Sequence, residues 1–163
     1  MKRLLIITVM CAVGFLSAIS FAEDSVYEPV PVMEHPSDNK WSKVKEELGK
    51  MLYFDPRLSG SNWISCATCH NPGLGWGDGL PRTIGDGQKE LGRHAPTIIN
   101  SGFFEVQMWD GRKKSLEDQA QGPIAATVEM NQDYDELIME LKALPGYVNR
   151  FEKVFGKNSL TIG

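Results

Sequence analysis

Residues 41–52 show the clearest helical pattern in the chain. They place an apolar side chain at every third or fourth position, with lysines and glutamates between them: Trp41, Val44, Leu48, Met51 and Leu52. Apolar residues at this spacing share one face of a helix. Asp55-Pro56 and Ser59-Gly60 then stop it, because proline cannot continue a helix. The pattern predicts an amphipathic helix that ends just before Asp55.

Three further helices are predicted toward the C-terminus. Each has a cap or breaker at one end or both. Ser115 followed by Asp118 opens a helix over about 116–121, and Asp133 followed by Glu136 opens the next. The apolar side of this next helix holds Leu137, Ile138, Leu141 and Leu144, and Pro145-Gly146 breaks it. A last helix is expected over about 147–155, closed by Gly156.

Two stretches lack any period and read as irregular chain. Residues 23–40 contain three prolines among acidic and polar residues, which is typical of an extended arm. Residues 71–93 are rich in glycine, which predicts a long loop region. A loop of this length in a compact domain is usually functional, and this one has room to wrap a bulky ligand. Because strand signals are weak throughout, the expected fold is mainly α with long loops.

The first 22 residues predict a cleavable secretory signal peptide. Lys2 and Arg3 precede an apolar run over 4–19, and small residues at Ser20 and Ala22 form a cleavage site. The alternative is a membrane anchor, but the apolar run is short for a full span. Cleavage after Ala22 delivers the chain to the periplasm.

Charge and cysteine content narrow the function classes. The formal net charge is −4, and removal of the signal peptide with its two basic residues takes it to −6. An acidic chain of this kind is not expected to bind nucleic acid. Only Cys66 and Cys69 remain after cleavage, since Cys11 lies within the signal. In an oxidising compartment two cysteines three positions apart suggest a disulfide, unless a third residue changes the chemistry.

His70 changes it, because residues 66–70 read Cys-Ala-Thr-Cys-His. This is the motif that attaches a c-type haem. The two thiols add to the vinyl groups of the haem, and the adjacent imidazole binds the iron as its proximal ligand. Two alternatives stay open, a redox-active Cys pair and a zinc site completed by His35 or His94. The export signal favours one covalent haem c over both.

The residue opposite His70 decides between electron carrier and catalyst. A methionine or histidine at the sixth position of the iron is typical of a carrier, whereas an open position permits catalysis. The candidates are His94, Met108 and Met130. A methionine is more often a core residue than a ligand, and the chain has seven of them.

An ordered set of short motifs resembles one known family. The motifs run in chain order from the first predicted helix to the last: 47–59 (ELGKMLYFDPRLS), 65–70 (SCATCH), 92–97 (GRHAPT), 109–112 (WDGR), 119–124 (QAQGPI), 129–130 (EM) and 145–147 (PGY). Together they resemble the N-terminal haem domain of bacterial di-haem cytochrome c peroxidases and their MauG-type relatives. The resemblance covers about 41–160, and it implies a cytochrome c-like haem domain over 41–163.

The resemblance also implies roles for individual residues. The haem on Cys66 and Cys69, with His70 on the iron, would react with hydrogen peroxide. Gln119 and Glu129 would line the distal side, where a buried carboxylate moves the peroxide proton and an amide donates a hydrogen bond without titrating. Trp109 would lie on the electron route from a second haem domain. That domain would take electrons from a small cytochrome c or a cupredoxin.

Three features depart from the family pattern. The chain has one Cys-X-X-Cys-His motif, so the second haem domain would be missing through truncation at Gly163 or carried on another chain. Asp86 stands where many members have a loop histidine that caps the iron, and since Asp is a poor ligand for this iron we expect an open resting site. His94 stands where an Asn binds calcium. Imidazole is a poor calcium ligand, which argues against a calcium site here.

Four functions remain as hypotheses. The first is a periplasmic cytochrome c peroxidase domain that reduces hydrogen peroxide to water. The second is a MauG-like oxidase that acts on a protein or organic substrate. The third is a mono-haem electron-transfer protein with Met130 or Met108 on the iron, although such a carrier needs neither Gln119 nor Glu129. The fourth is a remnant that only binds haem.

Overall fold

The computed structural model describes residues 28–162. The predicted signal peptide over 1–22 and the start of the predicted arm lie outside the described residues. Residues 28–32 have no regular secondary structure and belong to a separate unit, whereas the compact unit begins at Met33. None of the helices within 28–162 has the length and apolar character needed to cross a membrane.

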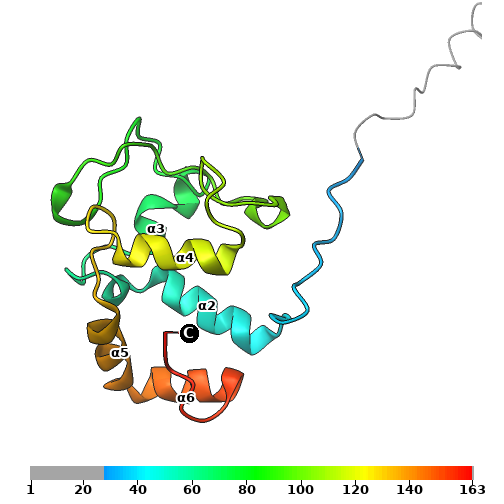
Figure 1. Ribbon diagram of the computed structural model, residues 1–163, viewed down its shortest axis with the longest axis vertical. Helices are drawn as coiled ribbons and strands as arrows, with labels where there is room; N and C mark the ends of the chain where they lie inside the picture. Colours follow the sequence, from blue (N-terminus) through cyan, green and yellow to red (C-terminus); the bar gives the residue numbers. More distant parts are fainter. Residues whose placement is uncertain (1–27, 163) are drawn as a thin grey trace, which may run out of the picture. The chain divides into compact units, whose positions relative to one another are not determined.

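The compact unit is built from helices joined by long loops (Figure 1). The α-helices are α2 (Lys43–Phe54), α3 (Cys66–Cys69), α4 (Leu116–Ala125), α5 (Tyr134–Lys142) and α6 (Pro145–Phe155). Four single-turn 3-10 helices lie between them: η1 (Pro56–Leu58), η2 (Pro72–Leu74), η3 (Asp86–Gln88) and η4 (Ser101–Phe103). Across the described part of the chain, β pairing is limited to three isolated bridges. The prediction of a mainly α fold is confirmed.

Local caps explain where the helices begin. The hydroxyl of Ser42 accepts a hydrogen bond from the Lys45 amide, so α2 begins two residues later than its apolar pattern. Asp133 caps α5 by accepting from two backbone amides, as the sequence predicted. Helix α5 ends at Lys142, before the predicted break, and Leu144 is instead the N-cap of α6. Pro145 opens α6, because a proline at the first helical position has no amide to leave unpaired.

Helix α4 runs four residues past its predicted end, through Gly122 and Pro123. A proline in the last turn removes only the hydrogen bond to the carbonyl of residue 119. The carbonyls that follow are occupied, because Met130 N–H donates to Pro123 at 3.1 Å and Gln132 N–H donates to Ile124 at 2.9 Å. The end of α4 is therefore tied to the turn that carries Glu129.

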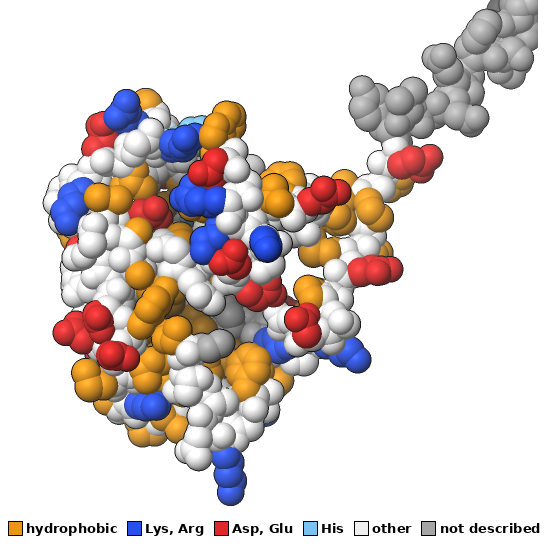
Figure 2. Space-filling model, viewed as in Figure 1, with side chains coloured by type: hydrophobic (Ala, Val, Ile, Leu, Met, Phe, Trp, Pro, Cys, Tyr) orange, Lys and Arg blue, Asp and Glu red, His pale blue; other side chains and the backbone are white. Residues whose placement is uncertain are grey.

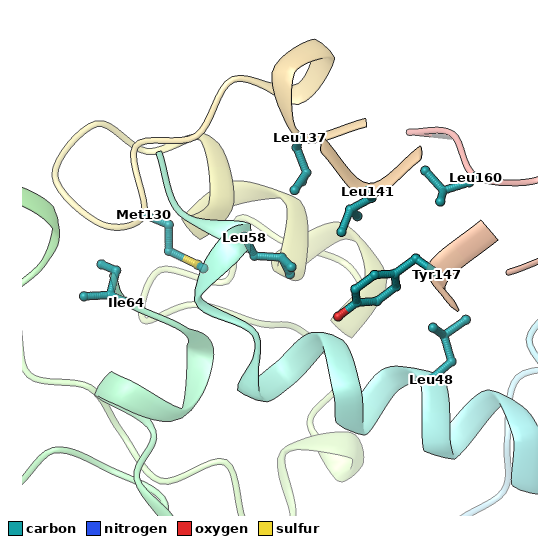
Figure 3. Packing of buried hydrophobic residues seen from close by; sticks show 8 residues of the cluster. All are labelled: Leu48, Leu58, Ile64, Met130, Leu137, Leu141, Tyr147 and Leu160. Carbon is teal, nitrogen blue, oxygen red and sulfur yellow. The ribbon is translucent and has the colours of Figure 1, made fainter. Parts of the chain in front are cut away.

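The apolar core lies among α2, α5, α6 and the segments beside them (Figure 3). Its buried members are Leu48, Leu58, Ile64, Met130, Leu137, Leu141, Tyr147 and Leu160. Met130, a candidate iron ligand of the electron-carrier hypothesis, is one of them and is 5% exposed. Residues 71–113 contribute no side chain to this core. Figure 1 shows these green loops at the top and α5 and α6 at the bottom.

A buried carboxylate stabilises the junction of α2 and α6. Asp55 is 6% exposed, and it accepts a hydrogen bond from the Tyr147 hydroxyl and two from the Arg57 guanidinium, at 2.7 and 2.8 Å. Burial alone would raise the pKa of Asp55, but the hydrogen bonds from Arg57 and Tyr147 outweigh it and hold the pKa below its usual 3.8. This contribution to stability is present above pH 3.8 and is lost as the pH falls through the lowered pKa.

Replacing Tyr147 with Phe is expected to lower the free energy of unfolding by about 1–3 kcal/mol at pH 7, because a buried carboxylate oxygen loses one of its donors and keeps only Arg57. Urea unfolding measures the change. The difference from the unaltered protein should shrink below pH 3.8, where the Asp55 carboxyl takes up a proton. Tyr134→Phe is the control, since that hydroxyl donates to an exposed backbone carbonyl, and it should cost less than about 1 kcal/mol. Equal losses in the two variants would contradict the buried-network interpretation.

Candidate functional site

The predicted haem-attachment residues lie on the single turn of α3. The amide of His70 donates to the Cys66 carbonyl at 2.9 Å and closes this turn. Cys66 and Cys69 are three residues apart, so the turn presents both thiols on one side. Both are free thiols. Burial raises the pKa of Cys66, and burial followed by Asp78 and Glu129 raises the pKa of Cys69 to about 11.

The orientation of His70 fits a haem ligand. Its Nδ1 lies 2.9 Å from the carbonyl oxygen of Pro96. A carbonyl only accepts, so Nδ1 carries the hydrogen and Nε2 keeps its lone pair for a metal. The Tyr53 hydroxyl donates to the His70 carbonyl at 2.6 Å, which holds the backbone of the same residue. Two adjacent thiols and a correctly oriented imidazole match the donor set for haem c.

The zinc alternative finds no support in this geometry. Within residues 28–162, no three His, Cys, Asp or Glu side chains gather in a way that would hold a metal ion. The two other histidines lie in exposed positions, and the His35 ring stacks on Trp41.

Glu129 lies in the turn after α4, and its carboxyl is within electrostatic range of His70. Burial raises the pKa of the Glu129 carboxyl, and electrostatic interactions with Arg112 and His70 offset part of that rise. Glu129 also raises the pKa of Cys69, which places its carboxyl within electrostatic range of both the thiol and the imidazole. Carboxyls whose pKa is raised by burial are common at functional sites.

Gln119 lies on α4, and its amide nitrogen is 3.8 Å from the sulfur of Met108. The sulfur of Met108, the second methionine of the electron-carrier hypothesis, thus accepts a weak hydrogen bond from Gln119. Trp109 follows in the next position and is 84% exposed, so its indole is not part of the apolar core. The guanidinium carbon of Arg93 lies 5.6 Å from the centre of the Trp109 ring, close enough for a cation–π interaction.

A cavity of about 370 Å³ adjoins Cys69, a volume within the range of small-molecule sites. The glycine-rich loop forms much of its wall, from Asp78 to Gln88, which agrees with the expectation that this loop wraps a ligand. Two large apolar side chains at its edge are strongly exposed, Trp63 at 71% and Leu80 at 45%. Figure 2 shows apolar side chains reaching the surface among scattered charges on the face in view.

A sequence profile described as "Di-haem cytochrome c peroxidase" matches residues 43–163. The chain belongs to the di-haem cytochrome c peroxidase family. Membership accounts for the haem-type donor set on α3, and it confirms the resemblance drawn from the motifs.

Two curated members of the family show the extent of the similarity. The methylamine utilization protein MauG of Methylorubrum extorquens is 50% identical over 129 residues, which are 79% of this chain and 36% of that protein. Cytochrome c551 peroxidase of Pseudomonas aeruginosa is 41% identical over 136 residues, which are 82% of this chain and 39% of that protein. The chain therefore spans well under half the length of these relatives.

Solved structures confirm the fold. A MauG-like protein associated with microbial copper homeostasis superimposes with a TM-score of 0.76 at 28% identity, covering 84% of this chain and 41% of that one. The diheme peroxidase BthA from Burkholderia thailandensis gives a TM-score of 0.67 at 26% identity, covering 74% and 34%. The expected cytochrome c peroxidase-type fold is thus observed.

Several residues of this site had no role predicted from the sequence. The Arg112 charge acts on Glu129, and the Pro96 carbonyl orients His70. Both lie in motifs that carried the family resemblance, so the signal was present without a role attached. Asp86 was singled out only as a replacement for an iron ligand. It is 7% exposed and accepts a hydrogen bond from Asn131.

Proposed function

We propose that this chain is the peroxide-reacting haem domain of a periplasmic cytochrome c peroxidase, which reduces hydrogen peroxide to water. One observation carries the proposal. The Glu129 carboxyl is partly buried, which raises its pKa, and it lies within electrostatic range of the imidazole that would hold the haem iron. An electron carrier has no use for a proton-exchanging group in that position.

The haem would be held by thioether bonds to Cys66 and Cys69 and by His70 Nε2 on the iron. When bound, haem c supplies the redox chemistry of the reaction, in which one peroxide takes up two electrons and two protons and leaves as two waters. The contribution of the chain is to fix the group and to manage the protons. The Pro96 carbonyl and the Tyr53 hydroxyl keep the proximal imidazole in one orientation.

Glu129 would transfer the proton of the peroxide, and Gln119 would hold the peroxide by a hydrogen bond. The Glu129 carboxylate accepts a proton from one oxygen of the peroxide and returns it to the other, so that water rather than hydroxide leaves. Burial raises the pKa of this carboxyl, which increases its affinity for the proton that it must take up and release again. The Gln119 amide nitrogen would donate a hydrogen bond to the peroxide without changing its own charge.

Trp109 would link the domain to its electron supply. Its ring is 84% exposed and carries the Arg93 guanidinium on one face. An exposed indole is accessible to a second haem domain, and that domain would draw electrons from a small cytochrome c or a cupredoxin. We do not propose a calcium site, because His94 takes the place of the Asn ligand.

The resting iron is expected to have an open distal position, because Asp86 is buried and held by Asn131. The ferric protein with covalent haem should therefore show a high-spin optical spectrum that changes rapidly on addition of stoichiometric hydrogen peroxide. A low-spin spectrum with the methionine–iron charge-transfer band, unchanged by peroxide, would overturn the proposal in favour of an electron carrier. A bis-histidine low-spin spectrum would contradict the open site and implicate His94.

A MauG-like oxidase is the second candidate, and the 50% identity to a MauG protein favours it. The same site residues would then serve oxidation of a protein or organic substrate. Steady-state turnover with a reduced small cytochrome c separates the two candidates, because only a peroxidase consumes it in proportion to peroxide. The electron-carrier alternative is weakened by the positions of Met130 in the core and Met108 beside Gln119.

A further inference from the structure

The loop over 83–93 is closed upon itself. Thr83 N–H donates to the Arg93 carbonyl at 3.0 Å, Leu91 N–H returns a bond to Thr83 at 2.8 Å, and Gly85 N–H donates to Lys89 at 2.8 Å. The tip of the loop, η3, is thus presented as a small preformed unit rather than as a free strand of chain. Because the unit is closely packed, a displacement of its tip also displaces the segment in contact with the tip.

What the tip touches is the turn that carries Glu129. Asp86 N–H donates to the Glu129 carbonyl at 2.7 Å, and Asn131 Nδ2 donates to Asp86 Oδ2 at 3.2 Å. The Lys89 ammonium reaches the Thr127 carbonyl at 2.9 Å. Three hydrogen bonds therefore fasten the loop over 83–93 to residues 127–131.

Gly85 permits this close approach. A Cβ atom at this position would lie 2.0 Å from the Val128 carbonyl oxygen and 3.0 Å from that of Glu129. Both neighbours are backbone atoms, so they cannot move aside as a flexible side chain would. Any larger residue at position 85 must separate the loop from the turn.

One oxygen of the Asp86 carboxylate accepts no hydrogen bond in the protein. The side chain is 7% exposed, and its Oδ1 is buried with no hydrogen-bond partner in the protein. Asp86 also lines the cavity beside Cys69. A buried carboxylate oxygen without a donor is costly, so packing alone does not account for an aspartate at this position.

We propose that Asp86 is a positioning residue for Glu129. Through its backbone amide, its bond to Asn131 and the close contact allowed by Gly85, it fixes where the Glu129 carboxyl stands relative to His70. The proposal rests on the proposed function, in which Glu129 exchanges protons with peroxide. A displacement of about 1 Å of a catalytic group typically costs up to 100-fold in rate, so loss of this fastening should be measurable.

The test uses the haem-loaded protein and three variants of the fastening, with Gly92→Ala as the control. Asp86→Ala removes the acceptor, Asp86→Asn keeps an oxygen for Asn131, and Gly85→Ala forces the segments apart. Gly92 belongs to the same loop and has open space around it. Three quantities are measured: the rate of the ferric protein with peroxide, its rate of binding hydrogen cyanide, and hydrogen exchange at the amides of residues 126–131. Hydrogen cyanide must also give up a proton on binding, so it reports on Glu129 without turnover.

Asp86→Ala should slow both rates by about 10- to 100-fold and speed exchange in 126–131, at unchanged haem content and ferric spectrum. Asp86→Asn should restore most of the rate, Gly85→Ala should match or exceed the Ala effect, and Gly92→Ala should change nothing. Rates and exchange in Asp86→Ala equal to those of the unaltered protein would overturn the proposal, as would slowing that Asp86→Asn shares in full. If the unaltered protein ignores peroxide, the proposed function fails, but hydrogen exchange still decides whether Asp86 holds the turn.

Discussion

Replacing Glu129 with Gln is expected to slow the reaction of the ferric haem protein with hydrogen peroxide by about 10²- to 10⁴-fold, the usual contribution of a positioned acid–base group. The amide keeps the shape of the side chain but cannot accept the peroxide proton. Because burial raises the pKa of Glu129 above its usual 4.5, the reactive carboxylate accumulates only as the pH climbs through that raised value. The rate of the unaltered protein should rise with pH over this range, and that step should vanish in Glu129→Gln. Stopped-flow absorbance at a series of pH values measures both effects.

Glu47→Gln is the matched control, since Glu47 lies exposed on α2 and no site residue depends on it. Its rate and its pH profile should equal those of the unaltered protein. If Glu129→Gln keeps the full rate while its haem content and spectrum are normal, the assignment of Glu129 as proton acceptor is wrong. A loss of rate with the pH step retained would assign the titrating group to another residue.

Replacing Gly60 with Ala should destabilise the fold by about 3 kcal/mol or more, which is at the large end for a single substitution. The added Cβ would lie 2.2 Å from the Asn131 carbonyl oxygen and 3.1 Å from its carbon. Both are backbone atoms, and Gly60 N–H donates to the Met130 carbonyl at 2.9 Å, so the two segments cannot separate without losing a hydrogen bond. Urea unfolding measures the change in the free energy of unfolding.

Gly49→Ala tests the same chemical change where space is open. Gly49 lies within α2, and nothing is found within 4 Å of the position its Cβ would take. Alanine has the higher helix propensity, so this variant should gain about 0.5–1 kcal/mol. Opposite signs for the two variants are therefore expected. A Gly60→Ala protein as stable as the unaltered one would show that the turn at Asn131 yields freely.

The helices were predictable because their signals are local. Ser115 and Asp133 each bond to amides within three residues, and such caps are visible in the sequence. The end of α4 was not predictable, because Pro123 usually marks a boundary. The last carbonyls of α4 accept hydrogen bonds from later backbone amides such as that of Met130, and these bonds depend on how the following turn folds back. A helix boundary that depends on tertiary contacts cannot be predicted from a local sequence pattern.

The site residues also divide into those with a local sequence signal and those without one. Cys66, Cys69 and His70 are recognisable by spacing, because one helical turn imposes their chemistry. Glu129 and Gln119 have no local signature and were found only through the family resemblance. The bond between Asn131 and Asp86 joins residues 45 positions apart, and no periodicity or motif records such a pairing. The roles of Glu129 and Gln119 in peroxide chemistry stay predictions until the variants are measured.

The position of the apolar core has a consequence for how the polypeptide gains its structure. Buried apolar side chains come from α2, α5, α6 and their neighbours, whereas residues 71–113 contribute none. Regions with few apolar contacts open at lower free energy than the core, as separate cooperative units. Before the prosthetic group is attached, the chain would therefore consist of a protease-resistant helical half and a protease-sensitive loop half. Limited proteolysis of the apoprotein should cut first within 71–113, and haem insertion becomes the step that completes folding.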